Sequence, residues 1–176
     1  MIRLSRKRIR ELARAFDHGD AASPWPPGER RLKARLAGRR ARGRLCLTRR
    51  ELRWIGEWKS PRIRPQIARN SELRVQKVTA AAFQTRGDAA QLEVLLGLRG
   101  VGTAVASVIL HFGHPARHPI YDVRVRAALR RIGIRRPFPP TGAGWAAYAA
   151  VLRVLARRHR VTLRTLDKAL WRLGAS

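Results

Sequence analysis

Two glycines that flank a single valine join two apolar segments near the middle of this 176-residue chain. The segment reads Leu95-Leu96-Gly97-Leu98-Arg99-Gly100-Val101-Gly102-Thr103-Ala104-Val105-Ala106-Ser107. Glycine accepts positive φ and lets two backbones approach closely, so Gly100 and Gly102 predict a very short turn between two helices. Val101 can fill the gap between these helices, and the first N–H groups of the second helix then face outward. We therefore predict a helix-hairpin-helix in which Arg99 and the turn through Thr103 bind a phosphate group.

Helical periodicity extends through most of the remaining chain. Apolar residues recur at helical spacing, and Thr48 with Glu51 has the spacing of a capping box. The expected helices cover residues 5–16, 48–58, 71–83, 87–98, 103–112, 123–132, 144–159 and 162–173. We see no alternation of apolar and polar residues of useful length for a strand. The sequence thus predicts an all-α, compact multi-helix fold.

The first quarter of the chain differs from the rest in composition. Residues 1–47 are expected to hold one helix and a basic, Pro/Arg-rich segment, and residues 48–176 to form the main helical domain, with a shared core. Leu32 and Leu36 give a weak helical pattern within the basic segment. This segment is equally compatible with a basic arm that has no order without a bound polyanion.

The charge of the chain limits its partners. Lysine and arginine total 39 against 11 aspartates and glutamates, which gives a formal net charge of +28. Self-repulsion of this size destabilises a compact chain, and a polyanion such as DNA or RNA offsets it. A ribosomal or nucleoid-packaging protein would have the same charge balance. An anionic membrane surface fits less well, because no helix pairs a broad, bulky apolar face with a basic one.

Cofactor-binding and targeting signals are weak. Cys46 is the only cysteine, so the chain has no intrachain disulfide and no cysteine metal cage. His111, His114 and His118 lie near one another, but the glycine and proline between them prevent one helical face from presenting all three, so we expect no metal site. The N-terminus lacks the apolar run of a signal peptide, and we find no stretch of about 18 apolar residues. We expect a cytoplasmic, nucleoid-associated monomer without a cofactor.

A second motif follows the hairpin, and it reads His118-Pro119-Ile120-Tyr121-Asp122-Val123-Arg124-Val125-Arg126-Ala127. The hairpin, a further helix, and then a Pro-Ile-Tyr-Asp loop that opens another helix resemble the helix-hairpin-helix DNA glycosylase superfamily. Its members include endonuclease III and the adenine glycosylase that acts on mismatches. The resemblance is close over residues 93–133 and looser back to residue 48. It implies that Asp122 is the catalytic carboxylate.

The chain departs from that family at two places. Members that cleave the DNA backbone carry a lysine two residues after the second hairpin glycine, and Ala104 occupies that position here. Iron-sulfur members need four cysteines near the C-terminus, and this chain has none there. The resemblance therefore implies a cluster-free, monofunctional glycosylase that acts on double-stranded DNA, and it leaves the released base open.

The chemistry of base release favours an aspartate at position 122. Breaking an N-glycosidic bond builds positive charge on the deoxyribose, and a fixed carboxylate can stabilise that charge or activate the attacking water. The target base must first leave the helical stack, which requires a pocket beside the hairpin. The alternative is that Asp122 only caps the helix that begins at residue 123. One aspartate can also do both.

Further site residues are expected where the helix of residues 48–58 ends. Trp58 and Tyr121 are candidates for the base pocket, and Lys59 and Arg62 for contacts with the DNA backbone. The alternative for Trp58 is a place in the core, and for Lys59 a solvated surface position. A desolvated Lys59 could instead attack the sugar as a Schiff-base nucleophile. We favour a surface Lys59 that holds a phosphate, because Arg62 and Arg64 lie beside it.

Two functional hypotheses remain after these observations, besides the ribosomal or packaging alternative. The first is a DNA N-glycosylase that flips and excises a damaged or modified base. The second is a non-catalytic helix-hairpin-helix protein that binds DNA structure. Asp122 discriminates between them, because a pure binder gains nothing from a carboxylate beside phosphates. The hairpin and the regular helices count against a ribosomal or packaging protein.

Overall fold

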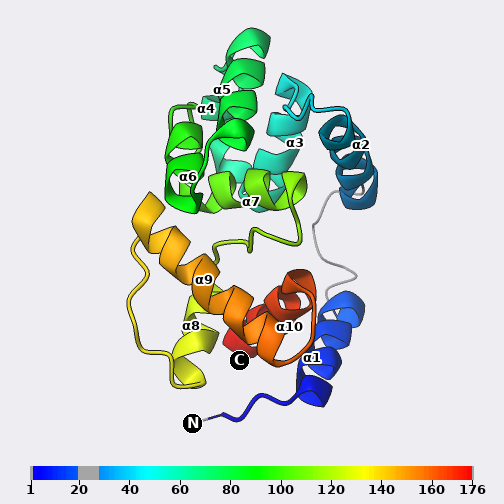
Figure 1. Ribbon diagram of the computed structural model, residues 1–176, viewed down its shortest axis with the longest axis vertical. Helices are drawn as coiled ribbons and strands as arrows, with labels where there is room; N and C mark the ends of the chain where they lie inside the picture. The colour runs from blue at the N-terminus through cyan, green and yellow to red at the C-terminus, as the bar shows by residue number, and fades with distance from the viewer. Residues whose placement is uncertain (1, 20–27, 176) are drawn as a thin grey trace.

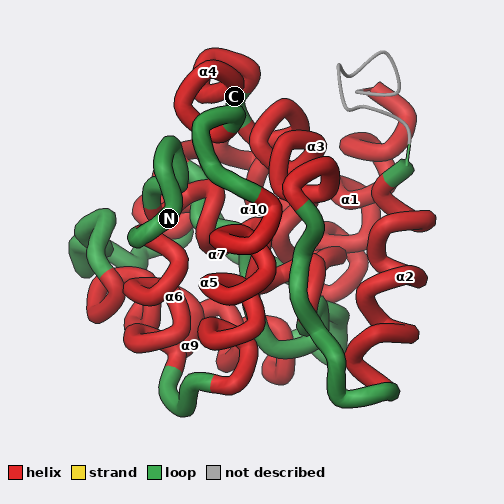
Figure 2. The backbone as a smooth tube through the Cα atoms, turned by 90° about the horizontal axis from the view of Figure 1, so that it is seen from above, coloured by secondary structure: helices red, strands yellow, loops and turns green. Residues whose placement is uncertain are grey.

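The computed structural model describes residues 2–19 and 28–175, and this part of the chain consists of helices and loops without a strand (Figures 1 and 2). The elements are α1 (Arg6–Gly19), α2 (Glu29–Ala41), α3 (Arg49–Lys59), the 3-10 helix η1 (Pro61–Ile63), α4 (Arg64–Ile67), α5 (Glu72–Gln84), α6 (Asp88–Leu96), α7 (Thr103–Gly113), α8 (Val123–Arg131), α9 (Gly142–Arg158) and α10 (Leu163–Ala175). The predicted all-helical class is confirmed. The expected helices agree with these bounds to within a few residues.

The helices form two lobes (Figure 1). Helices α2 to α7 make up the middle lobe, and α1 packs against α10 with α8 and α9 in the terminal lobe. Helix α9 reaches back to α6 and α7 and joins the lobes. The described parts of residues 1–47 are therefore divided between the lobes, since α1 belongs to one and α2 to the other. One continuous hydrophobic core runs through both.

The described part of the basic segment, after residue 28, forms a helix and is not a basic arm without order. Leu32 and Leu36 are buried on α2, and α2 packs against α7. Arg39 donates to the Glu51 carboxylate over 2.6 Å and so links α2 to the start of α3. Glu51 also accepts from the Thr48 backbone N–H at 2.9 Å in the predicted capping box. The proline-rich part at residues 20–27 lies outside the described residues.

The segment between α7 and α8 connects the lobes and is held at several points. The Nδ1 atom of His111 lies 2.8 Å from the carbonyl oxygen of His118. The Tyr121 backbone N–H donates to the Ser107 hydroxyl at 2.8 Å, and the Tyr148 hydroxyl donates to the Ile120 carbonyl at 2.7 Å. These bonds fix the approach of the chain to Asp122. Among the described helices, none combines the length and the apolar character needed to span a bilayer.

Candidate active site

The turn between α6 and α7 depends on Gly100. Its φ is +75°, a region that residues with a Cβ rarely adopt. A Cβ at this position would also lie 2.8 Å from the Cβ of Gln66 and 3.0 Å from the backbone nitrogen of Ile67. Val101 is buried between the helices, as its apolar side chain predicts. The local sequence therefore allows α4 to pack directly against the turn.

A buried asparagine holds the turn in place. Asn70 Nδ2 donates to the carbonyls of Ile67 and Arg99, at 3.0 and 2.9 Å, and Asn70 Oδ1 accepts from the Arg99 N–H at 2.9 Å. The side chain of Arg99 is exposed, as a phosphate contact requires. The sequence did not indicate this role of Asn70, because its partner Arg99 lies 29 residues away. The only local signal was a polar residue shortly after the end of α4.

The N-terminus of α7 is open. Gly102 is exposed, no side chain caps the helix, and a Cβ on Gly102 would meet nothing within 4 Å. The hydroxyl of Thr103 donates to the Pro140 carbonyl at 2.7 Å and is engaged within the protein. The backbone N–H groups of the first turn, together with the positive end of the helix dipole, could therefore bind an anion here.

Asp122 makes two contacts, one with each of its oxygens. Oδ1 accepts from the Arg124 N–H at 2.9 Å, so Asp122 is the N-cap of α8. Oδ2 accepts from the Lys59 ammonium at 2.5 Å. Lys59 ends α3 in the middle lobe and Asp122 precedes α8 in the terminal lobe, so this ion pair spans the junction. The side chains are only 10% and 16% exposed, respectively.

Lys59 is therefore not the open-surface residue that we favoured from the sequence. Its ammonium turns into the junction because α3 ends beside the loop that leads to Asp122. Arg62, three residues later on η1, is exposed and lies outside the hollow around the pair. The structure thus separates two residues that the sequence grouped on one DNA-contact surface.

A small hollow surrounds the Lys59–Asp122 pair. Its volume is about 20 Å³, which is room for about one water molecule. The hollow is lined by Phe16, Trp58, Lys59, Ile120, Asp122, Arg164, Asp167 and Trp171. Trp58 is one of its walls, and it also packs edge-on against the core ring of Phe112, with ring centroids 5.7 Å apart. The core interpretation of Trp58 is therefore confirmed, and its role in a base pocket stays a prediction.

Tyr121 does not belong to this hollow, contrary to the pocket role expected from the sequence. Its side chain is buried, its hydroxyl donates to the Phe138 carbonyl at 2.6 Å, and the guanidinium of Arg126 lies over its ring at 4.8 Å. Adjacent residues in the extended segment before α8 point in different directions. Asp122 therefore faces the lobe junction, whereas Tyr121 faces the loop before α9.

A second carboxyl group, that of Asp167 on α10, lines the hollow and was missed by the sequence reasoning. Asp167 accepts from Arg164 at 2.7 Å, and Arg164 also reaches Glu29 at 3.4 Å. Burial raises the pKa of the Asp167 carboxyl, against the opposing effect of the Arg164 and Lys59 cations. The sequence signal that could have identified Asp167 was an acidic residue on the apolar face of a predicted helix, in a chain with few acidic residues.

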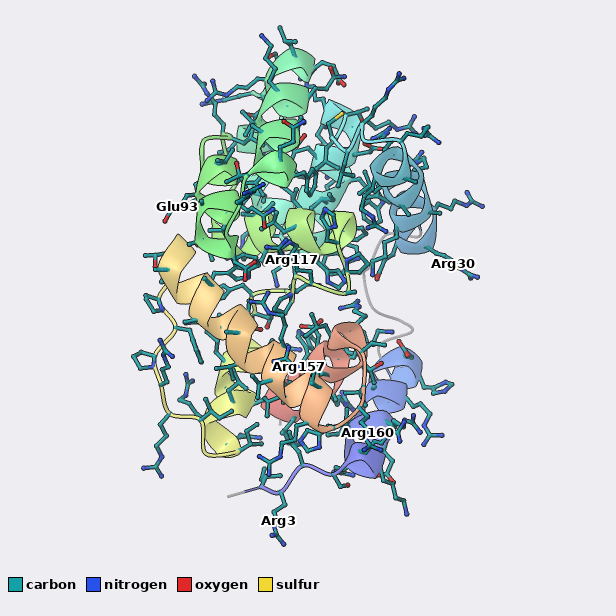
Figure 3. All side chains as sticks on the ribbon, viewed as in Figure 1. Arg3, Arg30, Glu93, Arg117, Arg157 and Arg160 are labelled. Atoms are coloured by element: carbon teal, nitrogen blue, oxygen red, sulfur yellow. The ribbon has the colours of Figure 1, made fainter. Side chains whose placement is uncertain are left out.

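Two of the three histidines near the end of α7, His111 and His118, are buried. Burial lowers the pKa of His111 and of His118 to about 3, so both are neutral near pH 7. Among the described residues, no group of three or more His, Cys, Asp or Glu side chains could hold a metal ion. Arg117, which precedes His118 and is labelled between the lobes in Figure 3, pairs with Asp88 at 3.2 Å.

Comparison with known proteins gives no match: no family model, no curated protein and no solved structure is similar to the chain at a significant level. Its function is therefore inferred from the chemistry of its own residues.

Proposed function

We propose that the protein is a monofunctional DNA N-glycosylase, which flips a damaged or modified base out of double-stranded DNA and releases it. The observation that carries the proposal is the position of Asp122. This carboxylate is held at the lobe junction by Lys59, and the chain that leads to it is bonded to the middle of α7. The residue before it, Tyr121, is bonded to Ser107, which lies only four residues after Thr103 and so about 6 Å farther along α7.

The two features support complementary steps. The open helix terminus and Arg99 can hold a phosphate beside the target nucleotide. The Asp122 carboxylate can then face the sugar of that nucleotide and stabilise the positive charge that develops as the base leaves. Its N-cap bond to Arg124 limits rotation of the carboxylate, so its orientation is set before DNA binds.

Lys59 supports base release without strand cleavage. An ammonium group that is ion-paired with Asp122 has no free electron pair with which to attack the sugar. Ala104, at the other position considered for an amine nucleophile, offers none. We assign Lys59 to the orientation of Asp122, and the aspartate to the chemistry.

Entry of a base requires a rearrangement. The hollow holds about one water molecule, which is too little for a base. The Lys59–Asp122 and Arg164–Glu29 ion pairs both join the terminal lobe to the middle lobe. We propose that the side chains at this junction separate as the flipped nucleotide enters, and that the binding energy of the DNA backbone supports this opening.

The small hollow also favours a second candidate, a non-catalytic protein that binds DNA structure. In that case Asp122 serves only as the N-cap of α8 and as the partner of Lys59. The two candidates differ in whether a base is released.

The decisive assay uses duplexes that each carry one damaged, deaminated or mismatched base. Alkali after incubation converts any abasic site into a strand break. We expect breaks with at least one lesion, only after alkali, and none with Asp122→Asn. The absence of breaks across a broad panel that the protein binds would favour the non-catalytic candidate.

Borohydride reduction tests the monofunctional part of the proposal. If Lys59 stays ion-paired, no covalent protein–DNA adduct is trapped during the reaction. A trapped adduct that disappears in Lys59→Ala, but persists in Arg62→Ala, would show that Lys59 is a nucleophile and that the protein also cleaves strands.

A further inference from the structure

Four arginines converge on a pocket between α8 and the loop that leads to α9. Arg126 and Arg130 lie one helical turn apart on α8, and Arg135 and Arg136 come from the loop. Pro137, Phe138 and Pro139 complete the lining, and the volume is about 340 Å³. We call this the arginine pocket. It lies outside the hollow around Asp122.

The positive charge of the arginine pocket is uncompensated. No carboxylate lines it, and none of the ion pairs among the described residues involves its four arginines. Arg126 is partly buried, and its Nε atom is buried without a hydrogen-bond partner. Like charges held together in this way repel each other, and a bound anion relieves the repulsion.

Total charge alone would not single out this place. Arg3, Arg30, Arg157 and Arg160 project from different parts of the molecule (Figure 3), so basic side chains occur on many sides. A cleft between α2 and α3 is also rich in arginine. There, however, Glu51 lies 2.6 Å from Arg39 and 3.8 Å from Arg35. The arginine pocket lacks such an internal counter-charge.

The wall of the pocket is fixed and is connected to the hairpin. Proline restricts the backbone at positions 137, 139 and 140, and Phe138 is buried. The Phe138 carbonyl accepts from the Tyr121 hydroxyl at 2.6 Å and from Arg126 at 3.4 Å. The Pro140 carbonyl accepts from the hydroxyl of Thr103, the first residue of α7. The pocket is therefore preformed beside the open N-terminus of α7.

We propose that the arginine pocket binds a backbone phosphate of the same DNA duplex that contacts the N-terminus of α7. Guanidinium groups bind phosphate oxygens in pairs of parallel hydrogen bonds. Duplex DNA offers one phosphate per strand for about every 3.4 Å along its axis, so two neighbouring anion sites can be filled at once. The inference rests on the DNA binding of the proposed function, but not on base release.

The test compares two triple variants that remove equal charge. Arg130→Ala/Arg135→Ala/Arg136→Ala empties the pocket of its exposed arginines. Lys7→Ala/Arg10→Ala/Arg14→Ala removes three exposed cations from α1, which packs on α10 away from α8 (Figure 1). Affinity for a short, unmodified duplex is measured by fluorescence anisotropy over a range of salt concentrations. Thermal melting confirms that both variants are folded.

We expect the pocket variant to lose about 10-fold or more in affinity, and to release about two or three fewer counterions on binding. The α1 variant should change much less in both quantities. Equal losses in the two variants, wild-type affinity in the pocket variant, or preferential competition by a structured RNA would overturn the inference. If the pocket-dependent binding is found but no lesion is excised, the glycosylase proposal fails and the phosphate site stands.

Discussion

The N-termini of α7 and α8 are built in opposite ways. Helix α7 begins after an exposed glycine, and no side chain caps it. Helix α8 begins after Asp122, whose Oδ1 accepts from the Arg124 N–H while its Oδ2 accepts from Lys59. One helix end is thus open to an external anion, and the other is closed by an anion of the protein itself.

In the proposed function, this difference separates phosphate binding from base release. A phosphate can approach the α7 terminus because Gly102 adds neither bulk nor charge there. A negatively charged side chain in that place would cap the helix and repel DNA. At α8 the negative charge is built in, and its second oxygen faces the lobe junction. We therefore assign backbone binding to the first terminus and base release to the second, and five predictions test this assignment.

Acid should have the largest effect, on the free energy of unfolding, because it weakens the link between the C-terminal end of α7 and the segment that leads to α8. His111 on α7 is bonded to the His118 carbonyl in the segment that leads to α8. Their folded pKa of about 3 lies below the ordinary 6.5, so the unfolded state binds more protons below pH 6.5. Stability should be full above that pH and should fall progressively toward pH 3, with a loss on the order of 2–4 kcal/mol at pH 5.

Urea unfolding at a series of pH values measures this dependence. His118→Leu removes one of the two titrating groups and should flatten the profile. An identical profile in wild type and His118→Leu would contradict the assignment of the acid effect to this link.

Asp122→Asn should have the next largest effect, on base release alone. Asparagine keeps the size and part of the capping ability, but it loses the charge that stabilises the transition state. We expect a fall of about 100-fold or more in the single-turnover rate, with DNA affinity retained or improved. A rate equal to that of the wild type would contradict the catalytic role of Asp122.

Gly100→Ala should destabilise the turn that precedes α7 and so disturb the N-terminus of this helix. Its φ of +75° and the nearby Ile67 nitrogen leave no room for a Cβ. We expect a loss of about 1–3 kcal/mol in the free energy of unfolding, measured by urea titration, together with weaker DNA binding. Gly43→Ala is the control, since its φ is also positive at +67° but nothing lies within 4 Å of the new Cβ. The close-packing interpretation fails if both variants lose the same amount.

Gly102→Asp should make the α7 terminus resemble that of α8. The new side chain enters open space at an ordinary φ of −94°, so stability should rise by a few tenths of a kcal/mol. Affinity for every duplex should fall about 10-fold, because the carboxylate occupies the anion site. Gly102→Asn has the same size without the charge and should bind more tightly than Gly102→Asp. Equal affinities of the two variants would show that charge at this terminus is unimportant.

Arg99→Ala should have the smallest effect. The backbone of Arg99 is held by Asn70, so the fold of the turn is retained and only one exposed cation is lost. We expect a few-fold weaker binding to all duplexes alike, and a salt slope lower by about one. A loss confined to one sequence or lesion would instead assign base recognition to Arg99.

The sequence predicted the features that depend on neighbouring residues. The capping box at Thr48, the turn at Gly100 and the N-cap at Asp122 all follow from spacings of a few positions, because the contacts are local. The same reasoning placed Trp58 at the end of α3, and its core alternative is confirmed. Local rules also explain why the bounds of the long helices were close to those observed.

Contacts between the lobes could not be predicted in this way. Lys59 and Asp122 are 63 residues apart, and only the packing of the lobes turns the ammonium inward. Asp167 lies on a helix whose pattern predicts simple core packing. Its partner Arg164 is on the same helix, but Lys59 and Asp122, which line the hollow with it, come from α3 and the loop before α8. Tyr121 was assigned to the pocket because it adjoins Asp122, but adjacent positions in an extended segment face different ways.

The central claim is that the two helix termini divide binding from base release. It is tested most directly by measuring, on one excised lesion, both duplex affinity and the single-turnover rate at saturating protein for the wild type, Asp122→Asn and Gly102→Asp. We predict that Asp122→Asn loses the rate by about 100-fold and keeps its affinity, whereas Gly102→Asp loses affinity by about 10-fold and keeps most of its saturated rate. Parallel losses of affinity and rate in both variants would contradict the claim.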